Sequence, residues 1–122
     1  MIAAASLALA AVPAPAADGA IDTPRLLAYC DEAMKDPRDA NAFRAGYCVA
    51  FVEGVLRGWE AGAYVRDAPV NYCVPAGVTL AQIVGVVVKS LRENPAELRG
   101  RAEVSVISAV QKGYPCSAPR RP

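Results

Sequence analysis

The stretch ANAFRAGYCVAFVEGVLRGWEAG, residues 40–62, decides the fold class because apolar side chains recur in it every four residues. These side chains are Phe43, Tyr47, Phe51, Val55 and Trp59. An apolar stripe at this spacing is typical of a long amphipathic helix with one face on a core. We therefore expect a helix over about Ala40 to Gly62.

A second row, made of small residues, runs along the same helix. It consists of Gly46, Ala50, Gly54, Gly58 and Gly62. Each glycine inside a helix costs up to about 1 kcal/mol relative to alanine, so such a row needs a reason. The expected reason is the close approach of a neighbouring helix. A membrane dimer face is the weaker alternative, because Glu53, Arg57 and Glu60 interrupt the segment.

Two further helices are indicated by their start signals. Thr23-Pro24 offers an N-cap with proline at the first helical position, which predicts a helix over about Pro24 to Met34. Thr79 and Gln82 have the spacing of a capping box, which predicts a second helix that ends before Asn94-Pro95.

The segment Ile83–Val88 inside that helix would also suit a buried strand, because β-branched residues are weak helix formers. The cap in front and the proline behind favour helix. A last helix is expected over about Arg101 to Lys112, and residues 61–77 are expected to form a loop. The predicted fold class is therefore all-α, a small four-helix domain with short connections.

The 122 residues include 13 basic and 12 acidic side chains and no histidine. A near-neutral chain gives no electrostatic reason to bind nucleic acid. Without histidine, the usual general base and the commonest metal ligand are both missing. We therefore expect no enzyme activity, no cofactor and no metal site. A secreted enzyme that uses Asp/Glu pairs or a cysteine is the disfavoured alternative.

The N-terminal segment predicts export. Residues 1–17 carry no charge, and their apolar run over Ile2–Val12 is too short to span a bilayer but suits a secretory signal peptide. A frayed apolar N-terminus on a cytosolic protein is the alternative, because no basic residue precedes the run. We expect a signal peptide over residues 1–17, a flexible lead-in over 18–25, a helical domain over 26–116 and a disordered tail over 117–122, with no membrane span after cleavage.

The four cysteines support export into an oxidising compartment. Cys30, Cys48, Cys73 and Cys116 form an even set without a CxxC pair and without neighbours that complete a zinc site. Two disulfides are favoured over free buried thiols, because a small secreted domain gains stability from such links. Of the three pairings, Cys30 with Cys48 and Cys73 with Cys116 fit antiparallel pairs of the first two and last two helices.

Four short motifs accompany these cysteines in order. They are CVAFVEG (residues 48–54), CVPAGVT (73–79) followed by Gln82, KSLRENP (89–95) and Tyr114-Pro115-Cys116. The ordered set resembles the Rap/Tai family of type VI secretion immunity proteins, and the likeness extends over about Leu26 to Cys116. The chain departs from the family pattern at Ala50, Phe51 and Asn94, which affects packing and a helix cap.

The resemblance implies a small periplasmic protein that binds and blocks a cell-wall amidase delivered by neighbouring cells. It also implies a homodimer that covers the active-site cleft of the amidase. Such an inhibitor needs no catalytic residues of its own, which agrees with the missing histidine. The alternative is a small periplasmic acid-stress chaperone of similar helical architecture, which would open when its carboxylates become protonated.

The loop after the long helix is the expected contact with the partner. It contains Tyr64, Arg66, Asp67 and Tyr72, and tyrosine and arginine are enriched at the energetic centres of interfaces. The alternative is that Tyr72 packs beside its disulfide and that Arg66 is solvated.

Overall fold

The computed structural model describes residues 20–122, which form four α-helices and one short 3-10 helix. The helices are α1 (Thr23–Ala33), α2 (Ala42–Val65), α3 (Leu80–Glu93), the 3-10 helix η1 (Pro95–Arg99) and α4 (Ala102–Gly113). The all-α prediction with four main helices is therefore confirmed. None of the helices in this range is long and apolar enough to cross a membrane. The expected signal peptide over residues 1–17 lies outside the described residues.

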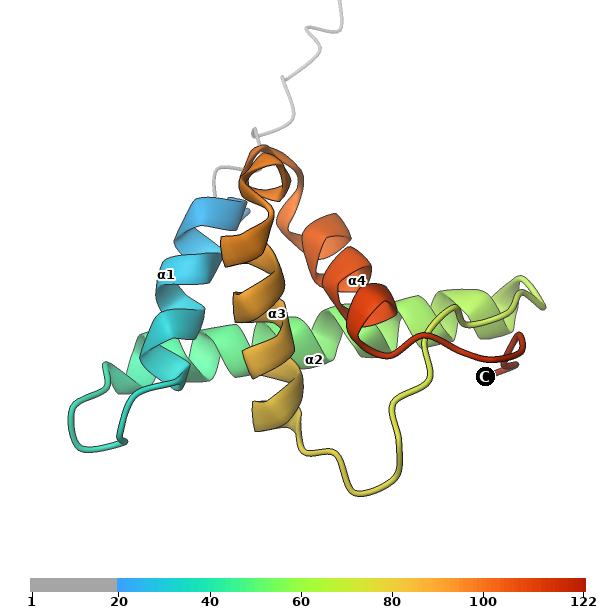
Figure 1. The fold of residues 1–122 in the computed structure, drawn as a ribbon, viewed down its shortest axis with the longest axis horizontal. Helices are drawn as coiled ribbons and strands as arrows, with labels where there is room; N and C mark the ends of the chain where they lie inside the picture. The colour runs from blue at the N-terminus through green and yellow to red at the C-terminus, as the bar shows by residue number, and fades with distance from the viewer. Residues whose placement is uncertain (1–19) are drawn as a thin grey trace, which may run out of the picture.

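Helix α2 is the longest element, and the other three helices cross one side of it (Figure 1). α3 lies between α1 and α4 and contacts both. With 24 residues, α2 is about 36 Å long, and three helices packed about 8–10 Å apart occupy most of that length. Three short helices can therefore share one long helix only by crossing it.

The expected pairing of helices is confirmed at one end and corrected at the other. α3 and α4 run in opposite directions on either side of η1, as predicted (Figure 1). α1 crosses α2 steeply, so the two do not form the expected antiparallel hairpin (Figure 1). Both predicted disulfides are nevertheless present, Cys30–Cys48 and Cys73–Cys116, each with its Cα atoms 5.0 Å apart. The first pairing needs only that both cysteines lie near the turn between the helices.

The buried face of α2 lies one position away from the stripe that its sequence suggests. The buried residues of the helix are Cys48, Val52, Leu56 and Ala63. The stripe residues flank this row, and Phe43 at the start of the stripe is 72% exposed. Because both rows are apolar, the sequence does not say which one points inward. The disulfide to α1 turns Cys48, and with it the row of Val52 and Leu56, toward the core.

The row of small residues on α2 does not meet a neighbouring helix. A Cβ atom placed on Gly46, Gly54 or Gly58 would find no heavy atom of residues 20–122 within 4 Å outside the adjacent helix backbone. A Cβ atom on Gly62 would meet only the Arg66 side chain, at 3.5 Å. The prediction of close helix packing along this row is therefore wrong. The helices already fill the opposite side of α2, so the row faces open space.

The start of α3 forms as its sequence predicts. The backbone N–H of Gln82 donates to Thr79 Oγ1 at 3.2 Å, and the Thr79 N–H donates to Gln82 Oε1 at 2.8 Å. This reciprocal capping box satisfies two backbone donors that the helix itself cannot use.

The start of α1 differs from its prediction. The N-cap is Asp22, whose carboxylate accepts from the Arg25 N–H at 2.8 Å. Thr23, the expected cap, is buried, and its hydroxyl donates to the Gly100 carbonyl at 2.6 Å. Ile21 is buried as well, so part of the lead-in that we expected to be flexible belongs to the fold. The role of Thr23 depends on Gly100, which is distant in the sequence, so the local sequence does not reveal it.

Candidate functional site

The C-terminal end of α2 brings three of the four predicted contact residues to the surface. Tyr64 is 75% exposed, and Arg66 and Asp67 are exposed beside it. Asp67 has a φ angle of 49°, in the left-handed region that aspartate tolerates better than most residues. This residue ends the helix, and the Ala68 N–H donates to the Ala63 carbonyl at 2.9 Å. The turn leaves Tyr64 and Arg66 projecting from the last turn of α2.

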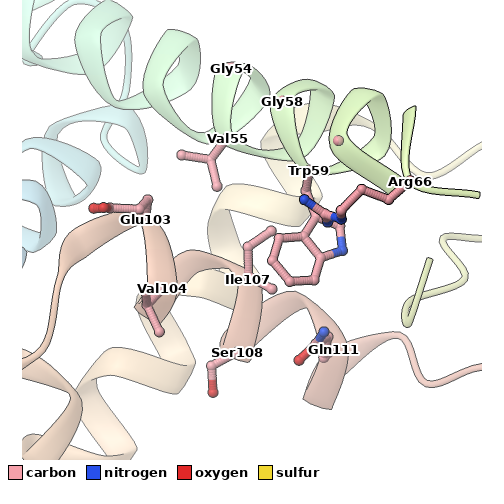
Figure 2. A pocket seen from close by; sticks show the side chains of 11 residues that line it. Gly54, Val55, Gly58, Trp59, Arg66, Glu103, Val104, Ile107, Ser108 and Gln111 are labelled. Atoms are coloured by element: carbon pink, nitrogen blue, oxygen red, sulfur yellow. The ribbon is translucent and has the colours of Figure 1, made fainter. Parts of the chain in front are cut away.

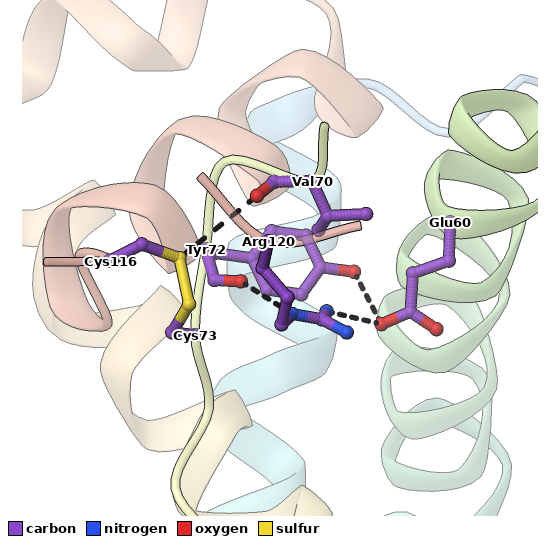
Figure 3. The surroundings of a disulfide bond; sticks show 6 residues. All are labelled: Glu60, Val70, Tyr72, Cys73, Cys116 and Arg120. Atoms are coloured by element: carbon purple, nitrogen blue, oxygen red, sulfur yellow. Dashed lines mark hydrogen bonds and ion pairs between the residues drawn. A yellow bond between two sulfur atoms is a disulfide. The ribbon is translucent and has the colours of Figure 1, made fainter. Parts of the chain in front are cut away.

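Tyr72 does not lie on this surface. It is 2% exposed, and its hydroxyl lies 3.2 Å from both the Leu56 carbonyl oxygen and Glu60 Oε1 (Figure 3). Burial, together with the Glu60 carboxylate, raises the pKa of Tyr72 above its ordinary value. The prediction of a partner contact is corrected here to the alternative, packing beside the disulfide of Cys73. The large apolar ring fills the interior while its hydroxyl reaches the Leu56 carbonyl and the half-buried Glu60 carboxylate.

The C-terminal tail holds the loop that contains Tyr72. The Val70 N–H donates to the Arg120 carbonyl at 2.6 Å. The Arg120 guanidinium donates to Glu60 Oε1 at 3.2 Å and lies 5.9 Å from the centre of the Tyr72 ring (Figure 3). Residues 117–122, expected to be a disordered tail, are therefore tied down at Arg120. The Cys73–Cys116 disulfide makes this possible, because it starts the tail beside the loop.

An open groove of about 470 Å³ lies between α2 and α4, next to the exposed end of α2 (Figure 2). It is lined by Gly54, Val55, Gly58, Trp59, Gly62, Arg66, Glu103, Val104, Ile107, Ser108 and Gln111. Figure 2 shows the Trp59 indole of α2 and Ile107 of α4 among the side chains that line it. The glycines of α2 supply no side chains on their side, which leaves the space open. The walls are mainly apolar.

Arg66 and the Trp59 indole lie together at one end of the groove. The Arg66 side chain lies beside the Trp59 indole (Figure 2). None of the ion pairs among residues 20–122 includes Arg66. Trp59 Nε1 is buried and has no hydrogen-bond partner in the same range. The exposed Arg66 guanidinium is a donor only, so this end of the groove suits an acceptor.

The charges elsewhere around the groove are already engaged. Glu103, at the far end, pairs with Arg101, and Asp67, next to Arg66 in the chain, pairs with Arg121. Within the described part of the chain, no three potential metal-binding side chains come together. The arrangement is therefore suited to binding an apolar group that carries a hydrogen-bond acceptor.

Sequence reasoning missed this groove. The apolar period places Trp59 in the core stripe, and no pattern in the sequence marks Val104, which is 58% exposed. The useful feature was the glycine row, which does mark a special face of α2. The prediction that a neighbouring helix packs on this row was wrong, because a row of glycines shows that space is left beside the helix but not what occupies that space.

Two comparisons with known proteins found nothing, and a third found a family. A family model described as Rap1a immunity proteins matches residues 22–116. No curated protein and no solved structure matches the chain. The matched range contains all four cysteines, the exposed end of α2 and the groove.

Proposed function

Because the chain belongs to the Rap1a immunity protein family, we propose that it binds and inhibits a peptidoglycan amidase delivered by a type VI secretion system. Family membership carries the general part of this proposal, immunity against a toxin effector. The ordered cysteine motifs, with their resemblance to Rap/Tai proteins, support an amidase as the effector. The same resemblance supports a periplasmic location after removal of residues 1–17 and a homodimer.

Inhibition by binding, without catalysis, is the proposed mode of action. The sequence contains no histidine, and its four cysteines are all joined in disulfides, so none is a free thiolate nucleophile. The two disulfides would also keep a small domain folded in an oxidising compartment.

The proposed contact surface is the exposed end of α2. Tyr64 and Arg66 project from the last helical turn, and Asp67 fixes the direction in which the chain leaves it. Tyrosine and arginine combine a large contact area with directed hydrogen bonds. Tyr72 lies in the interior next to this surface, where its hydroxyl bonds to Glu60, which also accepts from Arg120.

Binding to purified amidases tests the proposal. The full chain is expressed, the protein is recovered from the periplasmic fraction, and its N-terminus is read by mass spectrometry. It is then titrated by calorimetry into a panel of peptidoglycan amidases, and cleavage of peptidoglycan is followed in parallel. We expect tight binding to one amidase with loss of its activity. Binding to none of the panel, or binding without inhibition, would contradict the proposal.

The variant Tyr64→Ala/Arg66→Ala tests the surface. We expect it to weaken binding at least tenfold, about 1.4 kcal/mol, with no change in thermal stability, because both side chains are exposed. Phe43→Ala/Arg38→Ala is the matched control, because it removes an exposed aromatic and an exposed arginine near the other end of α2. Equal affinities of the two double variants would remove this surface from the proposal.

A further inference from the structure

We propose that the groove between α2 and α4 receives a segment of the effector in which an apolar side chain stands next to a carboxylate. This inference rests on the proposed function and deepens it, because it names the chemistry of the effector segment. The groove adjoins the exposed end of α2, and Arg66 belongs to both surfaces.

The shape of the groove argues for an apolar occupant. Gly54 and Gly58 leave open space on the α2 side, and no residue of the described chain fills it. The apolar walls are formed by the half-buried Trp59 of α2 and by Ile107 of α4. Val104 of α4, which is 58% exposed, adds an apolar side chain to the lining. Glycine weakens a helix interior, so a glycine row that serves no internal packing is best explained by a partner that uses the space.

The polar end of the groove argues for a carboxylate. Arg66 has no acidic partner among residues 20–122, and Trp59 Nε1 is a buried donor without an acceptor there. A carboxylate at this end would accept from the exposed Arg66 guanidinium, beside the Trp59 indole.

A second copy that met this groove with its own groove would offer no free carboxylate. The carboxylate that another copy would offer from its own groove is Glu103, which already pairs with Arg101. An effector chain carries no such restriction.

The experiment uses Trp59 as its own probe, because the chain contains a single tryptophan. Protein labelled with 5-fluorotryptophan gives one fluorine resonance from the groove. The amidase that binds in the panel above is added without label. We expect the resonance to move at saturation. If the amidase binds and the resonance does not move, the groove is not the binding site, and the proposed function still stands. If no amidase binds, both the proposed function and this inference are overturned.

Gly58→Leu tests the groove itself, and Gly46→Leu is its matched control. Both glycines lie on the same row of α2 and have open space around them, but only Gly58 lines the groove. We expect Gly58→Leu to weaken amidase binding at least tenfold and Gly46→Leu to change it less than twofold, while circular dichroism shows both folded. Equal binding by the two variants overturns the inference. So does a concentration-dependent dimer that Gly58→Leu abolishes without affecting amidase binding, which would assign the groove to a second copy.

The carboxylate has a test of its own. Arg66→Gln is expected to weaken amidase binding at least fivefold and to reduce its salt dependence, whereas Arg57→Gln, an exposed arginine of α2 outside the groove, has little effect. In the labelled protein, 3-phenylpropionate is expected to move the Trp59 resonance at lower concentration than 3-phenylpropylamine, which has the same apolar body with the opposite charge. A preference for the amine would overturn the assignment of a carboxylate.

Discussion

Glu97 shows how single side chains join distant parts of the molecule. Its Oε1 atom accepts from Lys112 Nζ at 2.9 Å and from the Ser108 hydroxyl at 3.1 Å. The hydrogen bond from Lys112, with that from Ser108, holds the pKa of Glu97 below its usual value of 4.5. The contacts connect η1 to two turns of α4, so this carboxylate helps to hold the last two elements together.

This depressed pKa predicts how stability depends on pH. A folded-state pKa below the unfolded value means that the contribution of Glu97 is complete above about pH 4.5 and is lost as the pH falls through the folded-state pKa. Glu97→Gln should therefore cost up to about 1 kcal/mol at pH 7 and less than that at pH 3. Urea unfolding of the wild type and the variant at both pH values measures the loss in the free energy of unfolding. Glu93→Gln, at a more exposed position with a looser 4.0 Å pair, is the control, and equal losses for both variants at pH 7 would contradict the prediction.

At the scale of elements, the glycines divide into those that the packing requires and those that it does not. A Cβ atom at Gly113, the last residue of α4, would clash with Val86 Cγ1 of α3. A Cβ atom at Gly46 in α2 would meet nothing within 4 Å. Only the first glycine is therefore explained by the approach of two helices.

This difference predicts opposite effects of the same substitution. Gly46→Ala should stabilise the protein by up to about 1 kcal/mol, because alanine is the better helix former and has room. Gly113→Ala should destabilise it, because the β-branched Val86 cannot move its methyl group away freely. Thermal unfolding of both variants measures the two shifts. A loss of stability in Gly46→Ala would show that something outside the described contacts uses that position.

At the scale of the whole molecule, two disulfides fasten opposite ends of α2 to the rest of the chain. Cys30–Cys48 joins α1 to the first half of α2 across 18 residues. Cys73–Cys116 joins the loop after α2 to the end of α4 across 43 residues. The second link also places the tail so that Arg120 reaches Glu60.

Removing the longer link should therefore cost more. In the chain-entropy account, closing the loops of 43 and 18 residues contributes about 4 and about 3 kcal/mol, respectively. Cys73→Ser/Cys116→Ser should also speed amide exchange at Val70, whose N–H donates to Arg120 in the tail, while Cys30→Ser/Cys48→Ser should not. Urea unfolding and hydrogen exchange measure both effects. Unchanged exchange at Val70 would mean that the tail holds the loop without the disulfide.

Much of the fold follows from local sequence. The capping box of Thr79 and Gln82 lies within one helical turn, so its residue types predict it directly. Both disulfide pairings could be predicted because their cysteines lie close to the ends of neighbouring helices. Tyr64, Arg66 and Asp67 are exposed, but Tyr64 lies in α2 and not in the predicted loop, because α2 continues to Val65 instead of ending near Gly62.

The sequence by itself determined the four helices, the capping box of α3, the cysteine pairs and the resemblance to an immunity protein family, because these depend on residues a few positions apart or on the order of motifs. The tertiary structure alone decided which apolar row of α2 is buried, that its glycine row lies open, and that Tyr72 lies inside while Arg120 holds its loop. Each of these depends on which distant residue fills a given space. Periodicity identifies a face of a helix, but only the packed chain shows what the face meets.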